Sequence, residues 1–175
     1  MMKKLCIIPV LLSVLLGMAC VPDGEPHKDS GETNNYFYTK IDPLGGGFVV
    51  EGATVTDYPM TDVTFINESI QEGSDIFLNE YDLRFVRPEK CSVAQCPPLT
   101  SITGMAFWTM VPAGGENTIV DVPMANYATY VEFYSNSIGG IPEVYYKVIA
   151  TFYGENEFGY PVKTKAEYIL IFSNP

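Results

Sequence analysis

Two stretches near the C-terminus alternate between inward and outward side chains with a period of two, and they constrain the fold most strongly. The segments are Val144–Tyr153 and Val162–Phe172, and the short polar segment Gly154–Gly159 separates them. The apolar sets are Val144, Tyr146, Val148, Ala150 and Phe152 in the first, and Val162, Thr164, Ala166, Tyr168, Leu170 and Phe172 in the second. Lys and Glu fall among the opposite sets, so the pattern predicts a half-buried antiparallel hairpin.

Further strand signals occur between clusters of Gly, Pro, Asn and Asp. They are Phe48–Thr56, Val63–Asn67, Asn79–Arg87 (with Tyr81, Leu83 and Phe85 facing inward), Ala106–Val111, Thr118–Val122 and Tyr127–Tyr134. The segment Ala125–Ser135 has a short helix as its alternative, and Gly45–Gly47 is predicted to be a turn before the Phe48 strand. Seven or eight short strands without a long helical pattern predict a single all-β antiparallel sandwich over residues 36–175.

The N-terminus has the pattern of a secretory signal peptide. Two lysines, Lys3 and Lys4, precede an apolar run from Leu5 to Ala19 that ends in small residues. This run of about 15 residues is shorter than the roughly 20 that a bilayer-spanning helix needs. We therefore interpret residues 1–19 as a cleaved signal, with a signal anchor as the alternative.

The end of this run, Leu16-Gly17-Met18-Ala19-Cys20, resembles the lipobox of bacterial lipoproteins. In that family the cysteine receives a diacylglycerol thioether and becomes the acylated first residue after cleavage. Gly17 stands where the family prefers Leu, and an ordinary signal-peptidase site is the alternative. Cys20 would otherwise be an unpaired thiol in an oxidising compartment, so we expect lipidation at Cys20 and a location at the cell envelope, in the outer membrane.

Residues 20–35 are predicted to form a lipidated, disordered tether, because no large apolar side chain follows Val21 there. Removal of Lys3 and Lys4 with the signal leaves 8 of the 10 basic residues against 21 acidic ones, a formal charge of −13. Such a charge argues against nucleic-acid binding and against electrostatic attraction to anionic lipid. Membrane attachment is therefore expected through the acyl chains alone.

The order of strands and loops resembles that of small immunoglobulin-like envelope lipoproteins of bacteria, whose function is unassigned. The residues that carry the resemblance are Leu78–Phe85, a variable loop, and the closing segment Ile149–Gly154; the likeness extends over Phe48–Phe172. The resemblance implies an immunoglobulin-like β-sandwich in the cell envelope, and it implies no active site.

Cys91 and Cys96 are predicted to form a structural disulfide that stiffens an exposed loop. Their C-x4-C spacing lacks the C-x-x-C pattern of a redox pair, and a zinc site would need two further thiolate or imidazole ligands. The only histidine, His27, lies in the predicted tether. We therefore predict no metal site and no cofactor.

The amino-acid sequence gives little support for a catalytic function. A Ser or Cys nucleophile would lack its histidine base, and no G-x-S-x-G motif occurs. Four loop carboxylates could act in pairs, and we interpret them as solvated charges, with calcium binding as the second interpretation. These carboxylates are Asp57, Asp62, Glu155 and Glu157. We predict that the protein is not an enzyme.

The chain contains 12 tyrosines and 10 phenylalanines, most of which are predicted to fill the core. Trp108 is predicted to be buried in a strand with Ala106 and Met110. A possible ligand face consists of four aromatic residues, Tyr145, Tyr153, Phe158 and Tyr160. The first functional hypothesis is a non-catalytic lipoprotein with a structural or protein-binding role and an envelope protein as partner. The alternative is a carbohydrate-binding module that binds a glycan through those aromatics.

Overall fold

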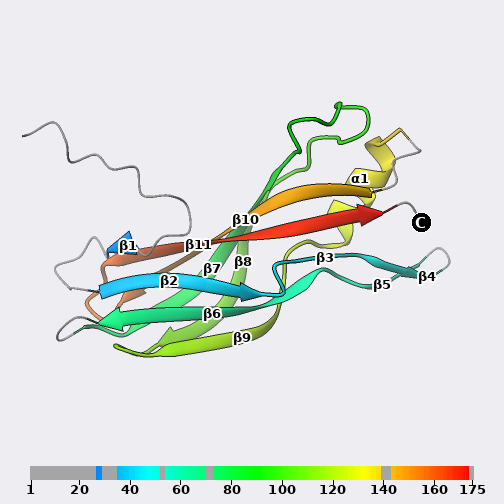
Figure 1. Ribbon diagram of the computed structural model, residues 1–175. Helices are drawn as coiled ribbons and strands as arrows, with labels where there is room; N and C mark the ends of the chain where they lie inside the picture. The colour runs from blue at the N-terminus through cyan, green and yellow to red at the C-terminus, as the bar shows by residue number, and fades with distance from the viewer. Residues whose placement is uncertain (1–26, 29–34, 52–53, 70–72, 139–142, 174–175) are drawn as a thin grey trace, which may run out of the picture.

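The computed structural model describes residues 27–28, 35–51, 54–69, 73–138 and 143–173, which form eleven strands and one helix (Figure 1). Cys20, the signal peptide and most of the predicted tether lie outside these residues. The elements are β1 (His27–Lys28), β2 (Asn35–Asp42), β3 (Gly45–Gly47), β4 (Val49–Glu51), β5 (Thr54–Asp57), β6 (Met60–Ser69), β7 (Ile76–Val86), β8 (Ile102–Val111), β9 (Glu116–Pro123), α1 (Tyr127–Asn136), β10 (Glu143–Asn156) and β11 (Pro161–Ser173).

The strands form two main sheets that face each other. One sheet has the order β1-β2-β6-β9, the other has the order β3-β11-β10-β7-β8, and β4 and β5 form a separate two-stranded sheet. Among the seven long strands, the first, second and fifth pair in one sheet and the other four pair in the second. This is how strands A, B and E face strands C, C′, F and G in immunoglobulin-like sandwiches. The predicted all-β immunoglobulin-like sandwich is confirmed.

The predicted C-terminal hairpin is confirmed as β10 and β11. These strands are antiparallel, with pairs that run from Glu143 opposite Ser173 to Glu155 opposite Pro161. Both predicted inward sets are buried, as are Tyr81, Leu83 and Phe85 of β7. At the centre of the core the ring of Phe152 lies 4.9 Å from that of Phe65, 5.4 Å from Tyr81 and 5.7 Å from Phe107, between ring centroids.

The prediction of a turn at Gly45–Gly47 was wrong. After the cis peptide bond between Asp42 and Pro43 the chain changes sheets, and these glycines form β3, which pairs in parallel with β11. A Cβ atom at Gly45 would lie 2.9 Å from the Ile169 carbonyl oxygen, and one at Gly47 would lie 2.5 Å from that of Ile171. The glycines therefore allow a close approach of two backbones, which the sequence pattern did not distinguish from a turn.

The prediction that Trp108 is buried was also wrong, because its side chain is 71% exposed. Both alternating sets of β8 are apolar, so a period of two could not tell which set faces the core. The register shifts against β7 at Leu78/Glu80, and Gly104 has a positive φ of 70°. With these irregularities Phe107 and Thr109 face the core and Trp108 faces solvent.

Two predicted strands have a different structure. Phe48–Thr56 contains the short strand β4 and most of the short strand β5, and Tyr127–Tyr134 is helical, so the helix alternative for Ala125–Ser135 is confirmed. The side-chain Oδ1 of Asn126 caps α1, accepting hydrogen bonds from the Thr129 N–H (3.0 Å) and hydroxyl (3.1 Å). The strand β2 was not predicted; its backbone pairs with β6 from Asn35 to Asp42.

The aromatic contacts predict that the core depends strongly on Phe152. We expect Phe152→Ala to lower the free energy of unfolding by about 3–5 kcal/mol, because a large cavity would remain between the sheets. Urea unfolding would measure the change. The control Val120→Ala, at a side chain that is 64% exposed, should change it by less than about 0.5 kcal/mol. An equally small effect for both variants would contradict this assignment of the core.

Candidate functional site

The four residues of the predicted ligand face do not form one surface. Tyr145 and Tyr153 share the outward face of β10, but eight residues separate them, which is about 26 Å along a strand. Phe158 and Tyr160 lie together at the tip between β10 and β11. There the Asn156 Oδ1 accepts both of their backbone N–H groups, at 3.1 and 2.9 Å. The structure therefore brings two of the four residues together.

The loop carboxylates are also dispersed. The Asp62 Oδ1 on β6 accepts the backbone N–H of Asp121 at 3.1 Å, and the Asp57 Oδ1 accepts that of Tyr58 at 2.8 Å. Within the part of the chain that the structure describes, no three His, Cys, Asp or Glu side chains gather in a way that could hold a metal ion. Calcium binding therefore has no site to which we can assign it.

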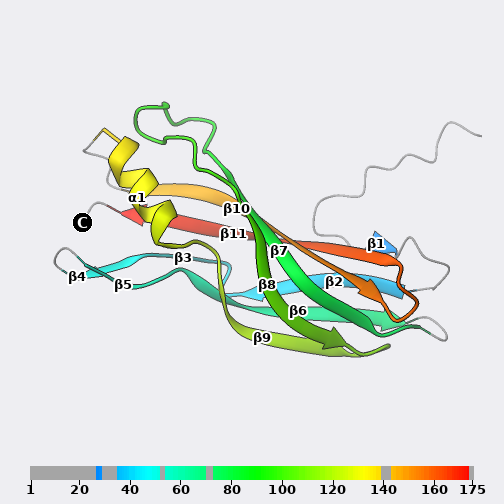
Figure 2. The same ribbon diagram turned by 180° about the vertical axis from the view of Figure 1, so that it is seen from behind.

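Three insertions between the long strands meet at one end of the sandwich, which we call the helix end (Figures 1 and 2). They are the hairpin of β4 and β5, the loop of residues 87–101 between β7 and β8, and the helix α1 with its flanking residues. The C-terminal end of β11 lies at the same end. β1 and the first residues of β2 lie at the opposite end, with the tip between β10 and β11.

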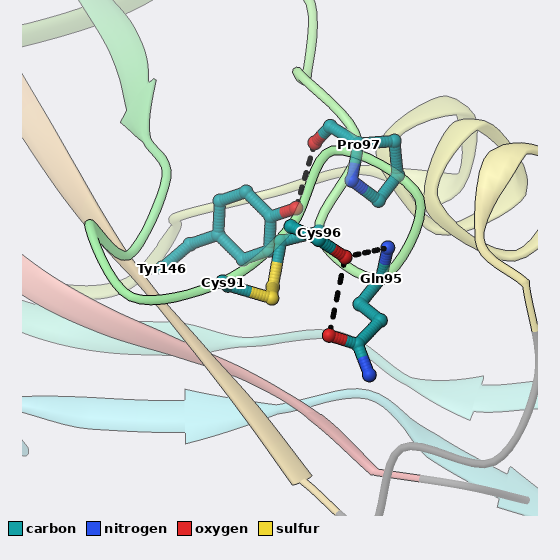
Figure 3. Close-up of a disulfide and its surroundings, with 6 residues drawn as sticks. Cys91, Gln95, Cys96, Pro97 and Tyr146 are labelled. Atoms are coloured by element: carbon teal, nitrogen blue, oxygen red, sulfur yellow. Dashed lines mark hydrogen bonds between the residues drawn. A yellow bond between two sulfur atoms is a disulfide. The ribbon is translucent and has the colours of Figure 1, made fainter.

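The predicted disulfide is present in the loop of residues 87–101. The Cα atoms of Cys91 and Cys96 are 5.8 Å apart, and the Cys96 side chain is completely buried. The hydroxyl of Tyr146, on β10, donates a 2.7 Å hydrogen bond to the Pro97 carbonyl oxygen (Figure 3). Burial raises the pKa of Tyr146 well above its usual value, so the hydroxyl keeps its proton and remains a donor. The loop is thereby fixed to the core.

The same loop is joined to the helix at two points. The Glu132 carboxylate of α1 accepts the Thr100 backbone N–H at 2.9 Å and the Thr100 hydroxyl at 2.7 Å. Just after α1, the Ile138 backbone N–H donates to the Ala94 carbonyl oxygen at 2.8 Å. Loop and helix therefore form one continuous surface, although about thirty residues separate them in the sequence.

Aromatic rings fix α1 to the end of the sandwich. The buried Phe133 ring stacks on Phe172 of β11 with 3.9 Å between centroids, and Phe48 approaches Tyr130 at 5.3 Å. The Tyr134 hydroxyl donates to the backbone carbonyl of Ser173. Aromatic pairs of this kind add about 0.5–1.5 kcal/mol each beyond the burial of area.

Several large apolar side chains at the helix end are exposed to solvent. Tyr127 and Val131 are one helical turn apart on α1, and Ile138 lies two residues after the helix ends at Asn136. Val93 lies in the adjacent disulfide loop, and Val49 lies on β4. The exposed fractions are 55% for Tyr127, 40% for Val131, 70% for Ile138, 60% for Val93 and 49% for Val49. We call these five residues the helix-end surface; they contain no charged group.

Sequence reasoning predicted the disulfide but not the helix-end surface. It placed Tyr146 in the core but did not predict the contacts of Glu132, Tyr146 and Ile138 with segments distant in the sequence. Only Asn126, a favoured helix N-cap residue directly before Tyr127, gave a local signal for α1.

The chain matches no protein-family model, no curated protein and no solved structure. In the described residues, no helix has the length and apolarity that crossing a bilayer requires.

We predict that the disulfide stabilises the helix end modestly. Cys91→Ser should lower the free energy of unfolding by about 2 kcal/mol, the chain-entropy estimate for so small a loop, and the protein should still fold. Cys91 is the better choice because Cys96 is completely buried, where a serine hydroxyl would add its own cost. Circular dichroism and urea unfolding would measure both points. Complete loss of folding would show that the bridge does more than close one loop.

Proposed function

We propose that this chain is a lipid-anchored protein of the bacterial envelope, and that its β-sandwich binds a partner protein through the helix-end surface. The lipobox-like segment Leu16–Cys20 supports the anchor, and the acidic composition supports attachment by acyl chains rather than by charge. A role in binding rather than catalysis is supported by the lack of a histidine apart from His27.

The observation that carries this proposal is the placement of the two ends. β2 starts at the end of the sandwich opposite α1 and the disulfide loop (Figures 1 and 2). β1 pairs with the first residues of β2 at that same end, and seven positions separate its His27 from Cys20. If Cys20 is anchored, the helix-end surface faces away from the membrane, where a partner can reach it.

The chemistry of the helix-end surface favours a protein as the partner. Its centre is apolar, and depletion of charge at the centre is what distinguishes protein interfaces from the remaining surface. Tyr127 adds an aromatic ring with a polar tip, one of the residue types that contribute most to such interfaces. The carbohydrate alternative has less support, because Tyr145, Tyr153, Phe158 and Tyr160 do not form one stacking platform.

We expect Cys20→Ser to move the protein from membrane fractions to soluble fractions, because the acceptor of the diacylglycerol thioether is lost. Fractionation of cells followed by immunoblotting would measure the distribution. Cys91→Ser is the matched control, since it also replaces a cysteine with serine but leaves the acceptor, and it should stay with the membrane. Intact-mass measurement of the purified native protein should show an acylated Cys20; an unmodified N-terminus there would contradict the anchor.

We also expect a photo-crosslinking residue at Val131 to capture one envelope protein in intact cells. The same residue at Phe158, a more exposed position at the opposite end of the sandwich, should not capture it. Ile138→Asp should abolish the adduct formed at position 131, because it places a charge in the apolar centre. Capture at position 158 but not at 131 would place binding at the tip between β10 and β11 instead.

A further inference from the structure

The strand β8 differs from every other long strand that the structure describes. It is the last strand of the five-stranded sheet, beside β7, and its ten residues, Ile102 to Val111, contain no charged side chain. Each of the other described strands of eight residues or more carries at least two charged residues. Soluble proteins usually protect an edge strand with Lys, Glu or Pro, since its free backbone groups can pair with another chain.

The outward face of β8 exposes the chain's single tryptophan. Trp108 is 71% exposed, and Ala106, two residues before it on the same face, is also exposed. Two residues further along β8, the Met110 carbonyl oxygen accepts the Asn117 Nδ2 from β9 at 2.9 Å, so the edge open to a partner is the part before Met110. Tryptophan is the residue type most enriched at sites that dominate protein binding energy.

Two carboxylates lie one strand inward from this edge. Glu80 of β7 pairs directly with Ala106, and the Asp82 Oδ1 accepts the backbone N–H of Gly104 at 2.9 Å. Burial, together with a hydrogen bond to Asp82, raises the pKa of the Tyr153 hydroxyl on β10. The small Ala106 side chain leaves the space between Glu80 and the free edge open.

The carboxylates and the Trp108 ring make this edge favour a partner with positively charged side chains. A strand that paired with the free edge of β8 would lie about 10 Å from β7, within reach of a Lys or Arg side chain that crosses Ala106 to Glu80. A cation at the next outward position would meet the face of Trp108, the aromatic ring with the strongest attraction for cations. The edge is thus complementary to an extended segment that carries basic residues.

We propose that β8 binds an extended basic segment of another protein by strand addition, with Trp108, Glu80 and Asp82 as the selective contacts. A second copy of this chain fits less well, because its own β8 carries no cation to meet Glu80 and its net charge of −11 opposes association. The proposal depends neither on the lipid anchor nor on the helix-end surface.

The single tryptophan makes the test direct, because fluorescence of the full chain that is excited where tyrosine does not absorb reports on Trp108 alone. The probe is a twelve-residue peptide in which Lys alternates with Thr and Val; the control peptide has Glu in place of Lys. Main-chain hydrogen bonds supply most of the affinity in strand addition, so a generic sequence is sufficient. We expect a saturable blue shift with the Lys peptide and none with the Glu peptide.

Two variants separate edge pairing from general attraction. Ala106→Lys should weaken Lys-peptide binding at least about tenfold, because it places a like charge on the edge. Val120→Lys, on the edge strand β9 of the other sheet, adds the same charge and should leave binding nearly unchanged. Circular dichroism of both variants would establish that they fold.

Three results would overturn the proposal. They are no saturable shift with the Lys peptide, equal shifts with both peptides, or equal weakening by both variants. Sedimentation of the full chain would test the remaining alternative, a dimer of this chain. A dimer that Ala106→Lys dissociates would assign the edge to a second copy of the chain instead.

Discussion

The pairing of β10 with two neighbours is the constraint on which the rest of the structure depends. Its backbone pairs with β11 from Glu143 to Glu155 and with β7 from Lys147 to Asn156. The register with β7 shifts after Tyr153, and a Cβ atom at Gly154 would lie only 1.9 Å from the Phe77 carbonyl oxygen. A glycine at this point allows β7 to stay close, and the buried face of β10 then brings Phe152 into the centre of the core.

The order of the strands in the two sheets gives the domain two ends with different connections. Connections between strands alternate between the ends, so every insertion in one set of connections accumulates at the same end. The β4–β5 hairpin, the disulfide loop and α1 are such insertions, and two of them are joined by the hydrogen bonds from Thr100 to Glu132 and from Ile138 to Ala94. An immunoglobulin-like sandwich thereby acquires a composite surface without any change in its sheets.

Local sequence patterns predicted the strands and buried faces that are determined by residues close together in the chain. The alternation in β10 and β11 identified both strands and their buried faces, because Lys and Glu marked the solvent side. The same rule failed in β8, where both alternating sets of side chains are apolar. There the bulge opposite Leu78 and Glu80 determines which set faces the core. The glycines of β3 and the strand β2 also escaped prediction, since their pairing with β11 and β6 involves segments distant in the chain.

The sequence by itself determined the all-β class, the C-terminal hairpin, the disulfide partners and an acidic chain with a lipobox-like N-terminal segment. These follow from side-chain periodicity, spacing and charge, which need no knowledge of distant contacts. Only the tertiary structure decided that Trp108 faces solvent on an uncharged edge and that Ile138 bonds to Ala94 of the disulfide loop. Both are consequences of strand register and loop packing, which depend on free-energy differences between whole arrangements rather than on any local segment.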